Sequence, residues 1–403
     1  MAKAVDRATF AGMAEQLAKT MSKRFKDGPV GIVKHAEDNF SAVTDWVSSG
    51  CQMLDLAMSN RPDGGFPCGR ISVLYGPEQS GKSLVAAHAL ANTQKAGGIA
   101  IFIDAESGMS ENFFNAIGVN TMATDGTWQL VLDNRLEVIF SVIEQYILDI
   151  RQIDKKVPIT IVLDSYAGCI TEEDNAGDFS LKGYNTAKAR IMSDALGRLT
   201  MLIARENVCM IITNQVKYNM NAQPFQSPWR MPGGQSLPHF ASIIIQLKKS
   251  KEIFATINNI KRPIGRIGIA IVEKNRLGPP HVKVNFTLYY DRGIDNLSSY
   301  IEYMDIFGIG KKSGAWIEYN TVDKSTGEQI KIRENGTISF VSKLKQYPYA
   351  INEIWEQICD KFIMAYSTSS DQLDHTQFTI EDAVEGSIVD VDEPEKEAAT
   401  IDD

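Results

Sequence analysis

The sequence lacks the features that mark secreted, disulfide-bonded and membrane-spanning proteins. Its five cysteines are odd in number and never form a C-x-x-C pair, so we expect neither a disulfide framework nor a structural zinc site. No apolar run approaches the roughly 20 residues that cross a bilayer. The first residues, MAKAVDRATFAGMAEQ, lack the apolar core of a secretory signal. We therefore expect a soluble cytoplasmic protein without a membrane partner.

Acidic excess is confined to one end of the chain. The 403 residues carry a formal net charge of −9, and residues 381–403 hold ten acidic residues and one lysine. The rest of the chain is formally neutral, with 40 basic and 40 acidic residues. The negative net charge of the whole chain therefore does not exclude a nucleic-acid partner. Such a run with almost no aromatics is typical of a solvated tail. Alternatively, the acidic tail regulates the protein by competing for a basic surface.

Short apolar runs alternate with amphipathic stretches through the middle of the sequence. The runs span 71–75, 99–103, 159–163, 208–213, 242–247, 267–272 and 282–289, and the expected helices span 82–95, 135–151 and 185–206. Nearly continuous β-branched runs alternating with helices indicate an α/β fold, with a mostly parallel sheet covered on both faces. Because no helix separates the last runs, that edge of the sheet should include antiparallel strands.

Four regions are expected along the chain. In residues 1–45, an apolar stripe (Phe10, Met13, Leu17, Met21 and Phe25) and a short strand cannot bury a core by themselves, so they must dock on this chain or on a neighbouring copy. Residues 46–292 form the α/β core. Residues 293–366 form a small α+β domain, with helices at 298–307, 337–345 and 350–366 and a strand at 316–319. Residues 367–403 are the acidic tail.

The strongest chemical signal is a phosphate-binding loop. The sequence Gly76-Pro77-Glu78-Gln79-Ser80-Gly81-Lys82-Ser83 has the pattern G-x-x-x-x-G-K-[ST], between an expected strand and an expected helix. Glycines allow backbone N–H groups to face phosphates, and the helix N-terminus adds partial positive charge. In this pattern Lys82 contacts the β and γ phosphates and Ser83 binds Mg²⁺. The loop predicts binding of a nucleoside triphosphate.

Polar side chains end the strands that should lie beside this loop. Asp164 and Ser165 follow the run 159–163, and a carboxylate there suits organisation of Mg²⁺. Asp104 and Glu106 follow the run 99–103, and an oriented glutamate can position or activate a water. Glu106 is the candidate for this role, with a helix cap as the alternative.

A third strand end, Asn214-Gln215, leads into a long aperiodic stretch. The amide pair is a candidate sensor of the γ phosphate, or else a satisfied strand end. Residues 216–232 contain three prolines and interleave aromatics with cations: Lys217, Tyr218, Phe225, Trp229 and Arg230. Such a loop suits stacking and phosphate contact along a single nucleic-acid strand, and a protein-binding loop is the rival reading. Residues 172–184 look similar but are more acidic.

Together these residues resemble the RecA family of homologous-recombination ATPases. The set continues from Phe66-Pro67-Cys68-Gly69-Arg70 through GPEQSGKS, FIDAE, Asp164-Ser165 and TNQ to Gly233-Gly234, Lys274-Asn275-Arg276 and Gly314-Ala315-Trp316. These segments stand in the family's order, and the resemblance covers roughly residues 5–366. A phosphate loop is generic, whereas this ordered set is specific to the family.

The resemblance implies a helical filament in which ATP is held between neighbouring subunits. Residues 76–83 would bind the phosphates, Glu106 would activate the water, and Ser83 and Asp164 would bind or organise Mg²⁺. Phe113 and Tyr289 would lie near the adenine, and Gln215 would couple the γ phosphate to the loop that follows it. Lys274 and Arg276 would reach ATP across the subunit interface, and the N-terminal stripe would dock on the neighbouring core.

The resemblance also implies the DNA partners. Residues 172–184 and 216–232 correspond to the two DNA-binding loops, Arg190 matches a basic DNA-contacting position, and Gly233-Gly234 follows the second loop. Lys248 and Lys249 align with basic positions of the family's secondary DNA site, while Ile269 and Ile271 stand where further cations are usual. The implied partners are single-stranded DNA, double-stranded DNA and further copies of this chain.

Two more departures preserve the chemistry of the family. Ser83 replaces the usual threonine and keeps the hydroxyl, while Arg276 follows Lys274 where two lysines are more usual. The sequence thus predicts a DNA-dependent ATPase that polymerises on single-stranded DNA and catalyses homologous pairing and strand exchange. A ring-forming helicase, a small-molecule kinase and a nucleotide-gated scaffold are the alternatives.

Overall fold

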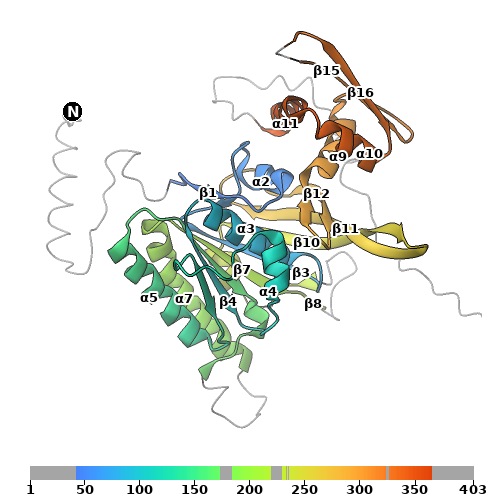
Figure 1. Ribbon diagram of the computed structural model, residues 1–403. Helices are drawn as coiled ribbons and strands as arrows, with labels where there is room; N and C mark the ends of the chain where they lie inside the picture. Colours follow the sequence, from blue (N-terminus) through green and yellow to red (C-terminus); the bar gives the residue numbers. More distant parts are fainter. Residues whose placement is uncertain are drawn as a thin grey trace, which may run out of the picture. The chain divides into compact units, whose positions relative to one another are not determined.

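A nine-stranded mixed sheet organises the described part of the chain (Figure 1). The strand order is β13-β12-β11-β10-β3-β7-β6-β4-β5. The strands are β3 (Arg70–Gly76), β4 (Ile99–Asp104), β5 (Trp128–Val131), β6 (Ile159–Asp164), β7 (Val208–Gln215), β10 (Ile243–Ile257), β11 (Ile260–Asn275), β12 (Val282–Tyr289) and β13 (Gly293–Asp295). Strands from β10 to β5 pair in parallel and those from β10 to β13 pair antiparallel, which confirms the predicted sheet and its antiparallel edge.

The computed structural model describes residues 42–172, 184–218, 229–232, 234, 236–323 and 326–364. By contacts the chain divides into two units, Met1–Ile363 and Met364–Asp403. The predicted N-terminal stripe and the acidic tail lie outside the described residues. The boundaries proposed for the four regions therefore stay predictions.

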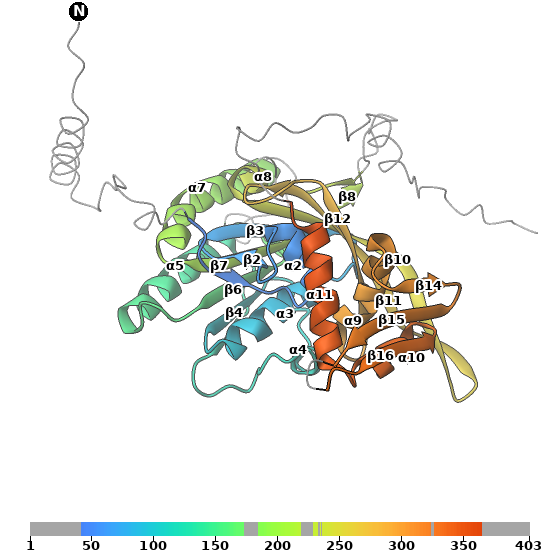
Figure 2. The same ribbon diagram turned by 90° about the horizontal axis from the view of Figure 1, so that it is seen from above.

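Helices cover both faces of the parallel strands (Figures 1 and 2). On one face lie α2 (Gln52–Ser59), α3 (Lys82–Lys95) and α4 (Glu111–Ile117), and on the other lie α5 (Leu136–Ile153), α7 (Tyr184–Arg205) and α8 (Ser236–Phe240). Successive strand residues point to opposite faces, so Leu74 joins the core under α3 while Val73 and Tyr75 join the core under α5 and α7. Two hydrophobic cores fix the sheet between its helices.

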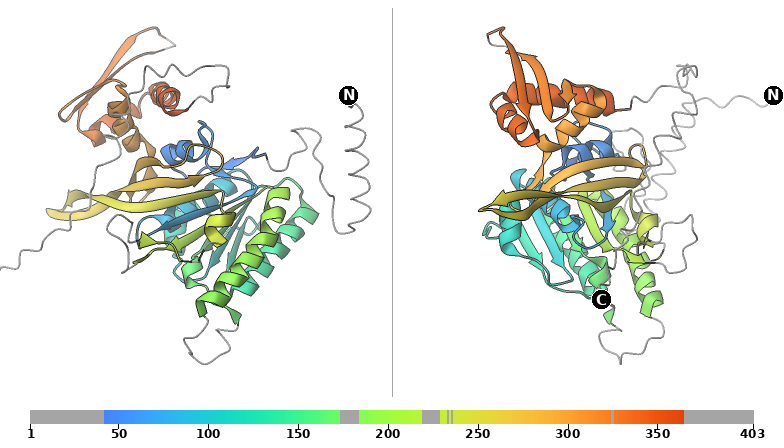
Figure 3. Two further views of the ribbon diagram at one scale, coloured as in Figure 1. Left: turned by 180° about the vertical axis from the view of Figure 1, so that it is seen from behind. Right: turned by 90° about the vertical axis from the view of Figure 1, so that its right-hand side faces the viewer.

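Strands β10 and β11 form a hairpin longer than the sequence predicts. They pair from Ile243 opposite Asn275 out to Ile257 opposite Ile260, and the hairpin projects beyond the other strands (Figure 3). The predicted runs, 242–247 and 267–272, cover only its base. The outer residues are mostly exposed and polar, so they lack the apolar pattern of a buried strand and are held by backbone pairing.

After β13, the chain forms a smaller α+β group. Helix α9 (Asn296–Phe307) is capped at its start by Asp295, whose carboxylate accepts the Ser298 N–H. Gly308, in the left-handed region, caps its end. The other elements are β14 (Lys311–Ser313), β15 (Trp316–Val322), β16 (Gln329–Asn335), α10 (Thr337–Leu344) and α11 (Pro348–Phe362). The predicted helix 350–366 is thus misplaced at both ends, since Pro348 suits the first turn of a helix and the backbone is extended at Ile363.

Candidate functional site

The phosphate loop connects β3 to α3 at the carboxyl edge of the parallel strands. A Cβ atom at Gly76 would lie 2.2 Å from the Leu247 carbonyl oxygen, so only glycine fits there. Gly81 has φ +100, a backbone conformation that glycine adopts freely. Lys82 is buried, and its Nζ donates to the carbonyl oxygens of Gly76 at 3.0 Å and Pro77 at 2.8 Å. The loop is therefore held in shape by its own lysine.

A residue from β11 also holds the loop, and one hydroxyl inside the loop has no hydrogen-bond partner among the described residues. Arg266 of β11 donates to the Gln79 carbonyl oxygen at 2.6 Å and to the Tyr290 hydroxyl at 3.0 Å. Ser80 Oγ is buried and has no hydrogen-bond partner among the described residues. A buried hydroxyl without a partner costs about 1–3 kcal/mol, so a bound group that hydrogen-bonds to it would be stabilised. The site fits a phosphate ligand on this observation.

A hydroxyl and a carboxylate meet beside the loop. The Ser83 hydroxyl donates to Asp164, and Thr213 Oγ1 donates to Asp164 Oδ1 at 2.5 Å. Burial raises the pKa of Asp164, and these two hydrogen bonds oppose the shift. Burial also lowers the pKa of Lys82. Oxygen ligands of this kind suit Mg²⁺, so Ser83 and Asp164 fit the predicted metal position, and Thr213 is a supporting residue that the sequence did not reveal.

Asp104 and Glu106 have different roles in the structure. Asp104 is buried, and its carboxylate accepts the backbone N–H groups of Glu106, Gly108 and Met109 at 3.1, 3.2 and 2.9 Å. Asp104 thus holds the turn between β4 and α4, and no described side chain caps the start of α4. Glu106 Oε1 instead accepts hydrogen bonds from the Ser165 hydroxyl and from Gln215 Nε2, the latter at 3.2 Å. Three strand ends meet at the Glu106 carboxylate.

The amide pair that ends β7 also divides its roles. Asn214 is fully buried; its Nδ2 donates to the Pro232 carbonyl oxygen at 2.7 Å and its Oδ1 accepts the Gln215 N–H at 3.0 Å. It matches the satisfied strand-end amide. Gln215 is half-buried and reaches Glu106. Asn214 thus connects this strand end to the residue that closes the stretch 216–232.

Lys274 and Arg276 lie away from the phosphate loop along the strands. Lys274 is opposite Ile244 of β10, which is opposite Val73 of β3, and the Arg276 N–H donates to the Ser242 carbonyl oxygen just before β10. Lys274 is thus level with the middle of β3 and Arg276 with its start, whereas the phosphate loop follows its end. Lys274 Nζ donates to the Pro238 carbonyl oxygen at 2.5 Å, and Arg276 donates to that of His239 at 3.0 Å. Burial, and then the charge of Arg276, lower the pKa of Lys274.

The two aromatic residues expected near adenine come from separate elements. Phe113 is half-buried on α4, packed beside Phe114 at 6.1 Å between ring centroids. Tyr289 is buried at the end of β12, and the Arg292 guanidinium lies 3.8 Å from its ring centroid. A Cβ atom on Gly81 would contact Leu288 at 4.0 Å, so this end of β12 adjoins the phosphate loop. The Arg292 contact has no signal in the sequence.

Only part of the predicted DNA-binding surface can be described. Residues 173–183 and 219–228, including Phe225, and Gly233 lie outside the described residues. Strands β8 (Lys217–Tyr218) and β9 (Trp229–Arg230) pair antiparallel through their backbones, which the sequence did not predict. Arg190 is exposed on α7, and Gly234 has a left-handed φ of +65.

Cations continue along the β10–β11 hairpin. Lys248 and Lys249 are exposed and lie opposite Ile269 and Gly268. Farther out, Lys261 lies over the ring of Phe254, with Nζ 4.7 Å from the centroid, and Phe254 is 47% exposed. An exposed aromatic beside exposed cations suits contact with a nucleic-acid strand.

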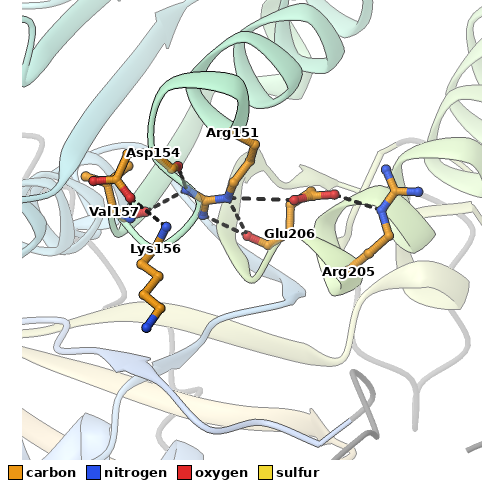
Figure 4. Close-up of polar contacts among 6 residues, drawn as sticks. All are labelled: Arg151, Asp154, Lys156, Val157, Arg205 and Glu206. Atoms are coloured by element: carbon orange, nitrogen blue, oxygen red, sulfur yellow. Dashed lines mark hydrogen bonds and ion pairs between the residues drawn. The ribbon is translucent and has the colours of Figure 1, made fainter.

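The amino edge of the sheet has a different kind of polar cluster (Figure 4). The Arg151 side chain, 9% exposed, donates to the carbonyl oxygens of Val157 at 2.8 Å and Glu206 at 2.8 Å. It also donates to the Asp154 carbonyl oxygen at 3.2 Å and lies 3.8 Å from the Glu206 carboxylate. Arg151 therefore connects the end of α5 to the turns that precede β6 and β7.

The described ranges contain neither a cluster of metal-binding side chains nor a membrane-spanning helix. No group of three or more His, Cys, Asp or Glu side chains there could hold a metal ion. No described helix is long and apolar enough to cross a bilayer.

Comparison with known proteins agrees with the site. The family model of the RecA N-terminal domain matches residues 13–295. The chain is 30% identical to Protein RecA of Mycoplasma mycoides over 344 residues, which cover 85% of this chain and 91% of the relative. It is 33% identical to Protein RecA of Leptospira meyeri over 327 residues, covering 79% and 78%. For Protein RecA of Corynebacterium glutamicum (strain R), identity is 31% over 349 residues, covering 86% and 85%. With this match over most of its length, the chain belongs to the RecA family of recombination ATPases.

Proposed function

We propose that this protein polymerises on single-stranded DNA with ATP held between neighbouring copies, and that the polymer catalyses pairing and strand exchange with a homologous duplex. The observation that carries the proposal is the separation of the phosphate loop, which follows the end of β3, from Lys274 and Arg276, which are level with its middle and its start and whose side chains donate to carbonyl oxygens of α8. A single copy cannot bring both sets to one nucleotide. Stacked copies can, because the loop of one copy then faces the cations of the next.

ATP and Mg²⁺ would bind at the carboxyl edge of the sheet. Residues 76–83 supply backbone N–H groups, and Lys82 would exchange its two loop carbonyl acceptors for phosphate oxygens. Ser83 and Asp164 would hold Mg²⁺, which supplies charge neutralisation at the phosphates. Phe113 and Tyr289 would lie near the adenine, and Asp104 keeps the turn after β4 in place.

Glu106 would orient the attacking water. Its carboxylate accepts hydrogen bonds from Ser165 and Gln215, and both donors can reorient toward a γ phosphate. Gln215 precedes the stretch 216–232, so its reorientation would move the start of that loop. This supports a coupling between the phosphate state and the affinity for DNA.

DNA would bind to residues 172–184 and 216–232, with Arg190 contacting the backbone. Lys217, Tyr218, Phe225, Trp229, Arg230 and Gly233-Gly234 belong to the second loop or follow it. The duplex partner would meet Lys248 and Lys249 at the base of the β10–β11 hairpin. The exposure of Arg190 and of both lysines supports these roles.

Mixing two inactive variants tests the shared nucleotide site. Lys82→Ala protein retains the cations, and Lys274→Ala/Arg276→Ala protein retains the phosphate loop. In a random equimolar filament about a quarter of the interfaces combine an intact loop with intact cations. We expect single-stranded-DNA-dependent ATP turnover to return to about that fraction of the wild-type rate. A mixture as inactive as its two components would contradict the proposal.

A further inference from the structure

Lys188 is a buried lysine that the described functions leave without a role. It lies in the second turn of α7, directly after residues 172–184, and is 9% exposed. Lysine is rarely buried to this degree, because the ammonium group loses its hydration. A buried ammonium therefore needs several good acceptors.

The acceptors are carbonyl oxygens on the other side of the same loop. Lys188 Nζ donates to the carbonyl oxygens of Tyr166 at 3.0 Å, Ala167 at 3.5 Å and Cys169 at 2.5 Å. It also lies 4.5 Å from the centroid of the Tyr166 ring. These residues form the short 3₁₀ turn η2 (Tyr166–Gly168) and the residue after it. Lys188 thus joins the two ends of the stretch 172–184.

This turn packs against Glu106. A Cβ atom on Gly168 would lie 2.7 Å from Glu106 Cγ and 3.0 Å from the Ala105 carbonyl oxygen, so the turn and the glutamate are in direct contact. Ser165, which precedes the turn, donates its hydroxyl to the Glu106 carboxylate. A shift of the turn would therefore move both a packing surface and a hydrogen-bond donor of Glu106.

The segment after the turn is held by α5. Ile170 donates its N–H to the Asn134 carbonyl oxygen at 2.7 Å and accepts the Leu136 N–H at 2.9 Å. The Glu172 N–H donates to the Glu137 carboxylate at 3.1 Å. The turn and the residues after it are thus held from two sides, by the start of α5 and by Lys188 of α7.

We propose that Lys188 is a positioning residue: it holds the Tyr166–Gly168 turn against Glu106, so that DNA bound at residues 172–184 sets the orientation of the Glu106 carboxylate. This deepens the proposed function and rests on it. Gln215 couples the second loop to Glu106, and Lys188 couples the first loop to the same carboxylate through the turn at Tyr166–Gly168.

The test compares Lys188→Met with Arg151→Met. Methionine keeps the unbranched shape and removes the donors, and Arg151 is the matched control because it is a buried cation on carbonyl oxygens at the other edge of the sheet. The readouts are kcat for ATP hydrolysis with and without single-stranded DNA and the Kd of a fluorescent non-hydrolysable ATP analogue. The ratio of the two kcat values does not depend on the fraction of folded protein, since both scale with it.

We expect Lys188→Met to bind the analogue within about twofold of wild type while its kcat ratio falls toward one. Arg151→Met should keep the wild-type ratio. A wild-type ratio in Lys188→Met overturns the inference, and loss of the ratio in both variants also overturns it, because the effect would then be a general one of removing a buried cation. A wild-type protein that DNA does not stimulate contradicts the proposed function itself, and the inference with it.

Hydrogen exchange of the wild-type protein decides the case if Lys188→Met does not fold. The amides of Gly168 and Cys169 donate to the carbonyl oxygens of Ser165 and Tyr166 at 3.1 and 3.2 Å. Adding single-stranded DNA in the presence of the analogue should slow exchange at these two amides. Unchanged exchange there, with slower exchange elsewhere, overturns the inference.

Discussion

The two edges of the nine-stranded sheet each hold a buried cation on backbone carbonyl oxygens, yet their surroundings differ. At the amino edge, Arg151 joins two turns that lead directly into β6 and β7. At the carboxyl edge, Lys188 joins the ends of a long loop, and the neighbouring Ser80 hydroxyl has no partner among the described residues. The amino edge thus holds turns of the fold together, whereas the carboxyl edge holds the phosphate loop and the candidate site around Glu106.

This difference separates stability from activity. Changes at the amino edge remove hydrogen bonds that stabilise the fold, and changes at the carboxyl edge remove groups that the proposed reaction would use. A change at the amino edge that reduced activity without reducing stability would contradict this separation.

The largest effect is expected for Lys82→Ala. Loss of the ammonium group that is proposed to contact the phosphates should lower ATP turnover by on the order of 10²–10³-fold, measured as phosphate release with saturating single-stranded DNA. Lys95→Ala, at the exposed other end of α3, is the control and should retain turnover. Persistent turnover in pure Lys82→Ala protein would rule out the assigned site.

Glu106→Gln should lower kcat by on the order of 10²-fold, because the isosteric amide cannot accept a proton from water. Binding of an ATP analogue should stay near the wild-type value, since the carboxylate contacts protein groups rather than the phosphate loop. Glu111→Gln on the exposed start of α4 is the control. Equal losses of binding and turnover would argue against a role in the chemical step.

Arg151→Met should lower the free energy of unfolding by about 2–4 kcal/mol, because three carbonyl oxygens and the Glu206 carboxylate lose their buried partner. Chemical denaturation measures the change, with exposed Lys155→Met as the control. The folded variant should still hydrolyse ATP. A stable but inactive variant would reverse the roles given to the two edges.

His88 is a partly buried histidine on α3, and its burial favours the neutral imidazole. Burial, and then the charge of Lys95, lower the pKa of His88 to about 4, and its Nε2 accepts the Ile294 N–H at 3.4 Å. The unfolded chain binds more protons between pH 6.5 and 4, so this histidine should lower stability as the pH falls through that range, by on the order of 2 kcal/mol at pH 5. His88→Gln should lack this part of the pH dependence when both proteins are denatured at pH 8 and pH 5. Parallel curves for the two proteins would refute the prediction.

The smallest effect is expected for Asn214→Asp. The aspartate still accepts the Gln215 N–H but cannot donate to the Pro232 carbonyl oxygen, so the end of the second loop is released. Affinity for single-stranded DNA in the presence of an ATP analogue should fall about tenfold, measured by fluorescence anisotropy. Asn120→Asp, which is exposed, should bind normally. Unchanged binding by Asn214→Asp would mean that the loop end does not depend on this amide.

Local signals predicted the carboxyl edge well. The helix 82–95 and the strand 282–289 match α3 and β12 at both ends, because glycines, polar strand ends and continuous apolar runs define them. The rule that parallel strands end at one edge brought Glu106, Asp164 and Gln215 to one site. Helix α4 and strand β5 were missed, since α4 is short and β5 is a half-buried edge strand without alternation.

Contacts that depend on register over long distances could not be predicted. Arg266 reaches Gln79 and Lys188 bonds to the turn at 166–169, and each pair is joined by tertiary packing rather than by a motif. The outer hairpin was missed for the opposite reason: its exposed residues carry no apolar pattern, although its backbone pairing is regular.

The placement of Lys274 and Arg276 away from the phosphate loop has a consequence for growth of the proposed polymer. One terminal copy would carry a nucleotide pocket with no cations facing it, and the copy at the far terminus would present cations with no pocket. The two tips are then chemically unlike, so addition and loss of subunits should proceed at different rates at each tip, and hydrolysis should be slowest in the terminal pocket.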